Sequence, residues 1–229
     1  MLELKSSNIR ATFSTLGARL VSVFVDGVDM LAGGGTDAQF MEGDFTAGAV
    51  CGRVAGRIAH ARFTLDGVEH KLVPNMGEHQ LHGGPDNFAT RDWKAERDKN
   101  SIRFTLHSPD GDQGYPGALD ASATYSLEGN VLSLDLEART TKPTVVNLTN
   151  HAYWNMAGQG SGLDQLAEIN AHSYLPLDDL KLPGGPGDYF EALARSATTV
   201  TLVEGDTPNA AAACDELTFA GERGEANTG

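Results

Sequence analysis

Short segments of alternating or β-branched apolar residues, separated by glycine-containing turns, recur along most of this chain. The clearest pair is a hairpin, in which residues 62–65 lead to Asp66-Gly67 and the pattern resumes at residues 68–73. An Asp-Gly pair between two such segments is a strong hairpin signal, because both positions readily adopt the left-handed backbone conformation. No segment before residue 160 shows sustained helical periodicity with caps. The pattern therefore predicts an all-β fold, an antiparallel β-sandwich.

Other segments with the same character are also expected to be strands. They are residues 9–13, 20–25, 101–107, 121–127, 131–138 and 144–148. The last of these is expected to be a buried strand, because Thr144-Val145-Val146 is a continuous β-branched run. A cluster of proline and glycine at residues 182–187 interrupts the series. We expect a β-sandwich over residues 1–183 and a divergent tail of uncertain structure over residues 184–229.

Charge and composition restrict the partners of the chain. Its net charge of −14 argues against nucleic acid, which requires a basic surface, and equally against an anionic membrane surface. The two cysteines, Cys51 and Cys214, have no CxxC spacing, so neither a disulfide framework nor a zinc ribbon is indicated. The first residues lack the features of a signal peptide, and no apolar run is long enough to span a bilayer. A cytoplasmic protein is expected, and its oligomeric state stays open.

The segment 147–155, Asn-Leu-Thr-Asn-His-Ala-Tyr-Trp-Asn, places one imidazole among amides and aromatic rings. Neighbouring amides can hold His151 in one tautomer, and an imidazole titrates near neutral pH, which suits proton transfer. Aromatic faces such as Tyr153 suit the C–H faces of a sugar ring. A core histidine bonded to backbone groups explains this segment equally well when it is taken alone.

Two further segments carry chemistry. In residues 79–85, the glycines after His82 allow the backbone to approach a ligand closely, although an ordinary turn with a surface histidine also fits. His79 and His82 have no zinc-site spacing. In residues 52–58, Arg57 can donate a fork of hydrogen bonds to sugar oxygens, or form a surface salt bridge. A phosphate loop and a GxSxG elbow are absent, and glycoside hydrolysis stays open because no carboxylate pair stands out.

Together these three segments, in this order, resemble the aldose 1-epimerases, also called galactose mutarotases. Residues 63–67 lie between the first two segments as they do in that family, and residues 16–19 and 175–179 are also similar. The resemblance covers about residues 8–183. It implies an antiparallel β-sandwich of the galactose mutarotase-like type.

The resemblance also implies an activity, the interconversion of the α and β anomers of free aldohexoses such as glucose or galactose. By resemblance, His151 and His82 are the catalytic residues: His151 gives a proton to the ring oxygen, and His82 stabilises developing charge in the same region. Arg57, preceded by Gly56, binds sugar oxygens, and Tyr153 lines the site. The substrate is a small monosaccharide, and neither a metal nor an organic cofactor is implied.

The sequence departs from the family at two places. Gly56 stands where the family usually has asparagine, so one side-chain donor and acceptor is lost. The resemblance fades after Leu182-Pro183, although the family's sugar-binding aspartate and basic glutamate lie in the C-terminal part; Glu204 is a weak counterpart of that base. We therefore expect a sandwich that is incomplete at its C-terminus, through a native, truncated or frame-shifted ending.

A sugar-binding or vestigial β-sandwich is the main alternative function, and a relative acting on a hexose 6-phosphate is another.

Overall fold

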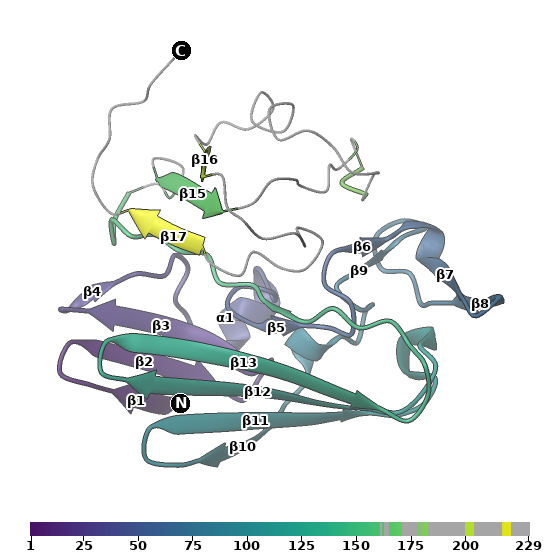
Figure 1. Ribbon diagram of the computed structural model, residues 1–229, viewed down its shortest axis with the longest axis horizontal. Helices are drawn as coiled ribbons and strands as arrows, with labels where there is room; N and C mark the ends of the chain where they lie inside the picture. Colours follow the sequence, from purple (N-terminus) through teal and green to yellow (C-terminus); the bar gives the residue numbers. More distant parts are fainter. Residues whose placement is uncertain are drawn as a thin grey trace. The chain divides into compact units, whose positions relative to one another are not determined.

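The computed structural model describes residues 1–160, 162, 165–170, 178, 180–182, 200–203 and 217–220. The chain divides into two compact units, Met1–Tyr153 and Trp154–Gly229 (Figure 1). The domain boundary predicted at residue 183 lies outside the described residues, as do Glu204 and Cys214. Within the described ranges, no helix has the length and apolar composition needed to cross a bilayer.

Two four-stranded antiparallel sheets form most of the first unit, which confirms the predicted all-β fold (Figure 1). Their strand orders are β1-β2-β3-β4 and β10-β11-β12-β13. The strands are β1 (Leu2–Lys5), β2 (Ile9–Ser14), β3 (Arg19–Val25), β4 (Val28–Asp29), β10 (Lys94–Arg97), β11 (Ser101–Ser108), β12 (Leu119–Glu128) and β13 (Val131–Thr140). The strands predicted at residues 9–13, 20–25, 101–107, 121–127 and 131–138 are thereby confirmed.

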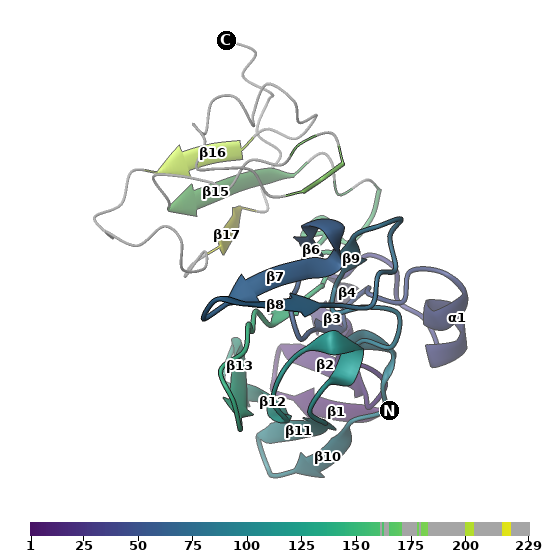
Figure 2. The ribbon, with the colours of Figure 1, turned by 90° about the vertical axis from the view of Figure 1, so that its right-hand side faces the viewer.

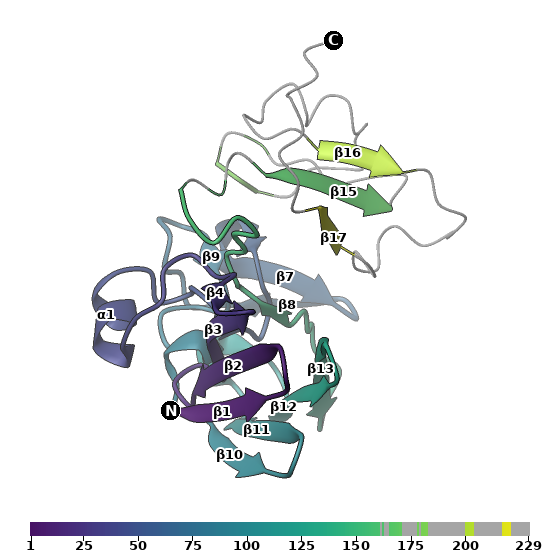
Figure 3. The same ribbon diagram turned by 90° about the vertical axis from the view of Figure 1, so that its left-hand side faces the viewer.

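Three aromatic rings join the two sheets. Phe13 of β2 contacts Tyr125 of β12 with ring centroids 4.7 Å apart, and Phe104 of β11 completes the cluster at 5.9 Å from Tyr125. All three side chains are fully buried. Aromatic pairs of this kind add about 1 kcal/mol each to the burial of their surfaces. Figures 2 and 3 show β1–β3 lying beside β10–β13 from two opposite sides, and this cluster packs strands of the two sheets against each other.

Short strand pairs and turns connect the sheets and carry the segments of interest. The paired strands are β5 (Val50–Cys51) with β14 (Thr149–Asn150), β6 (Arg57–Ile58) with β9 (Gln80–Leu81), and β7 (Arg62–Leu65) with β8 (Val68–Lys71). The 3-10 turns are η1 (Ala59–Ala61), η2 (Phe88–Thr90) and η3 (Asp112–Gly114). The predicted Asp-Gly hairpin is confirmed: Asp66 and Gly67 both have positive φ, of 51° and 77°, as this tight turn requires.

The prediction of a buried strand at residues 144–148 is wrong. Only Asn147 forms a bridge there, through its N–H to the Arg53 carbonyl oxygen at 2.9 Å and its carbonyl oxygen to the Ala55 N–H at 2.7 Å. Val146 is 40% exposed, although Val145 packs against the cluster around Tyr115. A β-branched run favours extended backbone, but a strand also requires a partner along its length, and among the described residues this segment has none until β14.

A short helix, α1 (Asp37–Glu42), was not predicted. It begins at a capping box: the Thr36 hydroxyl accepts a hydrogen bond from the Gln39 N–H, and the Gln39 side chain accepts one from the Thr36 N–H. Phe40 is its one buried residue and packs against Val21 and Ala47. Six residues are too few to display helical periodicity, so the Thr36-x-x-Gln39 pair is the signal that could have revealed it.

The described part of the second unit contains one small sheet. Strand β15 (Leu166–Asn170) lies between β16 (Val200–Val203), to which it is parallel, and β17 (Leu217–Ala220), to which it is antiparallel. The three segments that resemble the mutarotases reach the second unit only at Trp154 and Asn155. The candidate site is therefore built from the first unit.

Candidate active site

The backbone of His151 is fixed by the pairing of β14 with β5. Its N–H donates to the Ala49 carbonyl oxygen at 2.8 Å, and its own carbonyl oxygen accepts from the Gly48 N–H at 2.9 Å. The preceding pair, Asn150 with Val50, belongs to the same short antiparallel ladder. His151 thus directly follows β14, with its side chain half-buried.

Asn150 secures this position through its side chain. Its amide nitrogen donates to the Gly48 carbonyl oxygen at 2.7 Å and to the Tyr125 hydroxyl at 3.0 Å, and its amide oxygen accepts from the Ala152 N–H at 3.0 Å. Tyr125 belongs to the core cluster, so the candidate site and the core share a residue. The sequence suggested that neighbouring amides hold the His151 ring in one tautomer; instead, Asn150 binds backbone groups and Tyr125.

His82 is held against the segment that carries Gly56. Strands β6 and β9 pair Arg57 with Leu81, and one residue further the His82 N–H donates to the Gly56 carbonyl oxygen at 2.9 Å. In return, the Gly56 N–H donates to Nδ1 of the His82 ring at 3.1 Å. A neutral imidazole that accepts at Nδ1 carries its proton on Nε2. His82 is therefore fixed as an Nε2–H donor.

The pKa of His82 is lowered to about 4. Burial is the largest cause, and the positive charges of His151 and Arg57 add to it. The ring consequently stays neutral at physiological pH and keeps its single N–H available to an oxygen atom. His82 lies in a turn, as the sequence indicated, with its side chain half-buried.

Three rings form a row across the site. The His82 and His151 ring centroids are 5.2 Å apart at 86°, and those of His151 and Tyr153 are 5.0 Å apart at 56°. The Tyr153 hydroxyl donates to Oδ2 of Asp44 at 2.9 Å. The His151 ring lies half-buried beside these two aromatic neighbours, and no hydrogen bond from the ring to a backbone group is found among the described residues.

Asp44 was missed by sequence reasoning. Burial raises its pKa, but hydrogen bonds from the Thr46 side chain and backbone and from Tyr153 outweigh that effect, and the pKa lies below its ordinary value. The positive charge of His151 acts in the same direction. Asp44 therefore remains ionised beside the ring row. The Asp44-x-Thr46 spacing, typical of an Asx turn, was the local signal, but nothing in it indicates Tyr153 as a partner.

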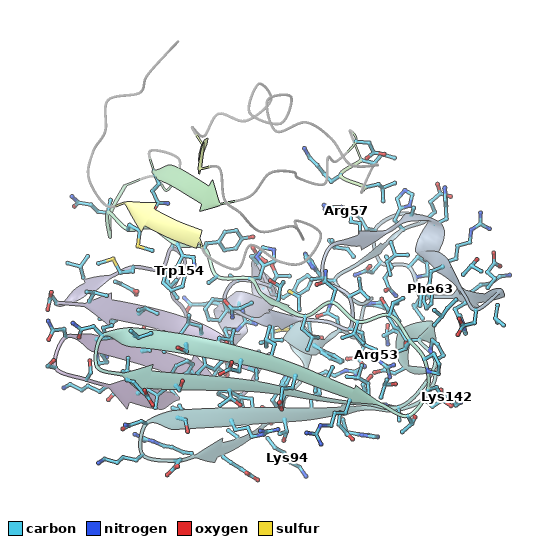
Figure 4. The ribbon with its side chains drawn as sticks, in the orientation of Figure 1. Arg53, Arg57, Phe63, Lys94, Lys142 and Trp154 are labelled. Carbon is cyan, nitrogen blue, oxygen red and sulfur yellow. The ribbon has the colours of Figure 1, made fainter. Side chains whose placement is uncertain are left out.

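Arg57 extends from β6 (Figure 4). Its Nε donates to the Met76 sulfur at 3.2 Å, and no ion pair of Arg57 is found within the part of the chain that the structure describes. The surface salt bridge considered from the sequence is therefore not formed among those residues. Gly56 beside it has a φ of +81°, and a Cβ built there meets no atom within 4 Å. Arg57 lies next to His82, and no hydrogen bond of its terminal nitrogens is found among the residues that the structure describes.

Arg53, four residues before Arg57, plays a different part (Figure 4). It is buried, and its guanidinium donates to the Ser108 hydroxyl at 2.9 Å and to the carbonyl oxygens of Gly117 at 2.8 Å and Pro109 at 2.9 Å. These contacts join the segment of β6 to the loop between β11 and β12. Arg53 is thus a structural residue, whereas Arg57 has no such contacts to the β11–β12 loop among the described residues.

One group of potential metal ligands occurs among the described residues, namely His60, Glu78 and His79. Nδ1 of His79 accepts the His60 N–H at 2.9 Å. The neutral His79 ring therefore carries its proton on Nε2 and has no free lone pair to offer a metal. These residues do not fit a metal centre.

Comparison with known proteins places the chain in a family. The family model for aldose 1-epimerases matches residues 1–202. Galactose mutarotase from Sus scrofa is 38% identical over 190 residues, which are 80% of this chain and 56% of that protein. Aldose 1-epimerase from Haemophilus influenzae is 45% identical over 144 residues, which are 61% of this chain and 42% of that protein.

Solved structures agree with the sequence matches. An aldose epimerase homologue from C. elegans superposes with a TM-score of 0.76 at 30% identity, covering 82% of this chain and 60% of that one. Galactose 1-epimerase from Lactobacillus acidophilus gives a TM-score of 0.71 at 29% identity, covering 81% and 57%. The fold is that of the galactose mutarotase-like β-sandwich.

The chain belongs to the aldose 1-epimerase family. It spans about half the length of the curated relatives that it matches.

Proposed function

We propose that this chain acts on free aldohexoses as an aldose 1-epimerase, opening the hemiacetal ring and closing it on the other face. The observation that carries the proposal is the neutral His82 beside His151. Because the Gly56 N–H donates to its Nδ1, the His82 ring carries its proton on Nε2. An N–H donor and a second imidazole side by side suit a reaction in which charge and a proton move on the sugar ring oxygen.

The proposed roles are those that the resemblance to the mutarotases implies, and the chemistry of each residue supports them. His151 gives a proton to the ring oxygen as the hemiacetal opens and takes it back on closure. His82 donates its Nε2–H to the same region and lowers the energy of the developing charge. Arg57 binds sugar hydroxyls through its terminal nitrogens, and Gly56 shapes the backbone beside it. The ring of Tyr153 offers its face to the C–H groups of the sugar.

The group that removes the proton from the C1 hydroxyl is not assigned. Asp44 is a poor candidate, because hydrogen bonds from Thr46 and Tyr153 lower its pKa and occupy its oxygens. Glu204 lies outside the described residues. A sugar-binding protein with little turnover is therefore the second candidate function, favoured by this poor fit of Asp44 to the role of the base.

Polarimetry separates the two candidates. Freshly dissolved α-D-glucose or α-D-galactose is followed with the protein, with buffer alone and with a His151→Asn variant. The proposal requires a rate above the buffer rate that falls in the variant. Saturable binding of the sugar in a calorimeter without any acceleration would instead support the sugar-binding protein.

A cytoplasmic location, expected from the cysteine usage, stays a prediction that fractionation can test.

A further inference from the structure

The His151 ring has no hydrogen-bond partner among the residues that the structure places. A catalytic imidazole is commonly oriented by a hydrogen bond to a second group, which fixes both its direction and its tautomer. Here the ring is flanked instead by His82 at 5.2 Å and Tyr153 at 5.0 Å. The orientation of His151 therefore depends on how firmly its two aromatic neighbours are held.

Both ends of the ring row are tied by hydrogen bonds. At one end, the Gly56 N–H holds Nδ1 of His82. At the other end, the Tyr153 hydroxyl donates to Asp44 at 2.9 Å, across 109 residues of sequence. Asp44 lies in the segment that leads into β5, so this hydrogen bond joins Tyr153 to that segment.

The Asp44 carboxylate is oriented for this contact by Thr46. The Thr46 N–H donates to its Oδ1 at 2.9 Å, and the Thr46 hydroxyl donates to the same oxygen at 2.5 Å. Thr46 is buried, which makes it a stable anchor for an otherwise exposed carboxylate. With Oδ1 so engaged, Oδ2 is directed to a single position, that of the Tyr153 hydroxyl. Hydrogen bonds to an ionised acceptor are stronger than those between neutral groups.

We propose that Asp44 is a positioning residue, which acts through the Tyr153 hydroxyl to hold the phenol ring against His151 and so orients the imidazole for proton transfer. The inference rests on the proposed function, since it concerns the same site. It also assigns the two parts of Tyr153: the hydroxyl is used by Asp44, while the ring, with 44% of the residue exposed, remains available to a sugar.

A double-mutant cycle tests this pathway. Asp44→Ala and Tyr153→Phe each remove the same hydrogen bond, so each should lower kcat about tenfold, the loss typical of one hydrogen bond to a charged group. The double variant should also lose about tenfold rather than about a hundredfold, because Asp44 acts through Tyr153. KM should change less than kcat, since Arg57 and the phenyl ring remain. Asp135→Asn, on the exposed side of β13, is the control for the change in charge.

A spectroscopic measurement tests the hydrogen bond without relying on turnover. Burial and the contact with Asp44 raise the pKa of the Tyr153 phenol. In protein labelled with ¹³C at tyrosine Cζ, the Tyr153 signal is identified by its loss in Tyr153→Phe. This signal should titrate at lower pH in Asp44→Ala than in wild type, and at the wild-type pH in Asp135→Asn.

The outcomes distinguish the inference from the proposed function. Multiplicative losses in the double variant, or a Tyr153 titration that Asp44→Ala leaves unchanged, would overturn the role of Asp44. A folded wild-type chain without any acceleration would instead overturn the proposed function. In that case the Tyr153 titration still decides whether Asp44 holds the ring.

Discussion

The fixed, neutral state of His82 gives the protein a specific dependence of stability on pH. Its pKa is about 4 in the folded chain, against an ordinary value of 6.5. Because the folded pKa is the lower one, the unfolded chain binds more protons as the pH falls from 6.5 towards 4. His82 therefore destabilises the fold in that window, and the loss is complete below pH 4.

The magnitude follows from the two pKa values. At pH 5 the ring is mostly protonated in the unfolded chain and mostly neutral in the folded one. The linkage relation gives a loss of about 2 kcal/mol between pH 7 and pH 5. Water reaches part of the half-buried ring and screens its neighbours, so we expect a loss of about 1–2 kcal/mol.

A matched variant isolates this contribution. His82→Asn removes the titrating ring, yet asparagine tolerates the left-handed φ of 52° and its side-chain oxygen can accept the Gly56 N–H. Urea unfolding of both proteins at pH 7 and pH 5 gives two free-energy differences, in which all other titrating groups cancel. Wild type should lose about 1–2 kcal/mol more than the variant. Equal losses would refute the assignment of a half-buried, neutral His82.

Other variants test the rest of the site. His151→Asn should lower kcat by about a hundredfold or more in polarimetry, since the proposed proton-transfer group is removed. Arg57→Ala should raise KM about tenfold with a smaller change in kcat, measured over a range of sugar concentrations. Gly83→Ala should destabilise by about 3 kcal/mol or more in urea unfolding, because φ is +93° and the new Cβ would lie 1.9 Å from the Gly52 carbonyl oxygen. Asn150→Ala should cost about 1–3 kcal/mol of stability by the same method.

Much of the fold could be predicted because its signals are local. Alternation in residues 9–13 and 121–127, and the Asp66-Gly67 turn, depend on residues a few positions apart, and each of these strands or turns is confirmed. The prediction of a strand at residues 144–148 is wrong for the opposite reason. Its β-branched run favours extended backbone, but whether a partner strand lies beside it depends on distant parts of the chain.

The candidate site shows the same division. His82, Arg57 and His151 were selected from their segments, and the structure brings His82 next to both of the others through the β6–β9 pair and the ring row. Asp44 and the true partners of Asn150 were not predicted. The Asn150 side chain reaches Gly48, 102 residues away, rather than the ring of its neighbour. A side chain bonds to whatever group the fold places within about 3 Å, and spacing along the sequence does not report this.

By itself, the sequence determined the strand-forming segments, their turns and the kinds of side chain that the proposed sugar site requires, because these follow from backbone preference and from the chemistry of single residues. Only the tertiary structure decided the tautomer, charge and orientation of those side chains. The proton of His82 sits on Nε2 because the Gly56 N–H occupies Nδ1, and the Tyr153 ring is held because Asp44 lies within reach of its hydroxyl. Tautomer, charge and orientation are set by the groups that surround a side chain, and chain folding brings those groups together from distant positions.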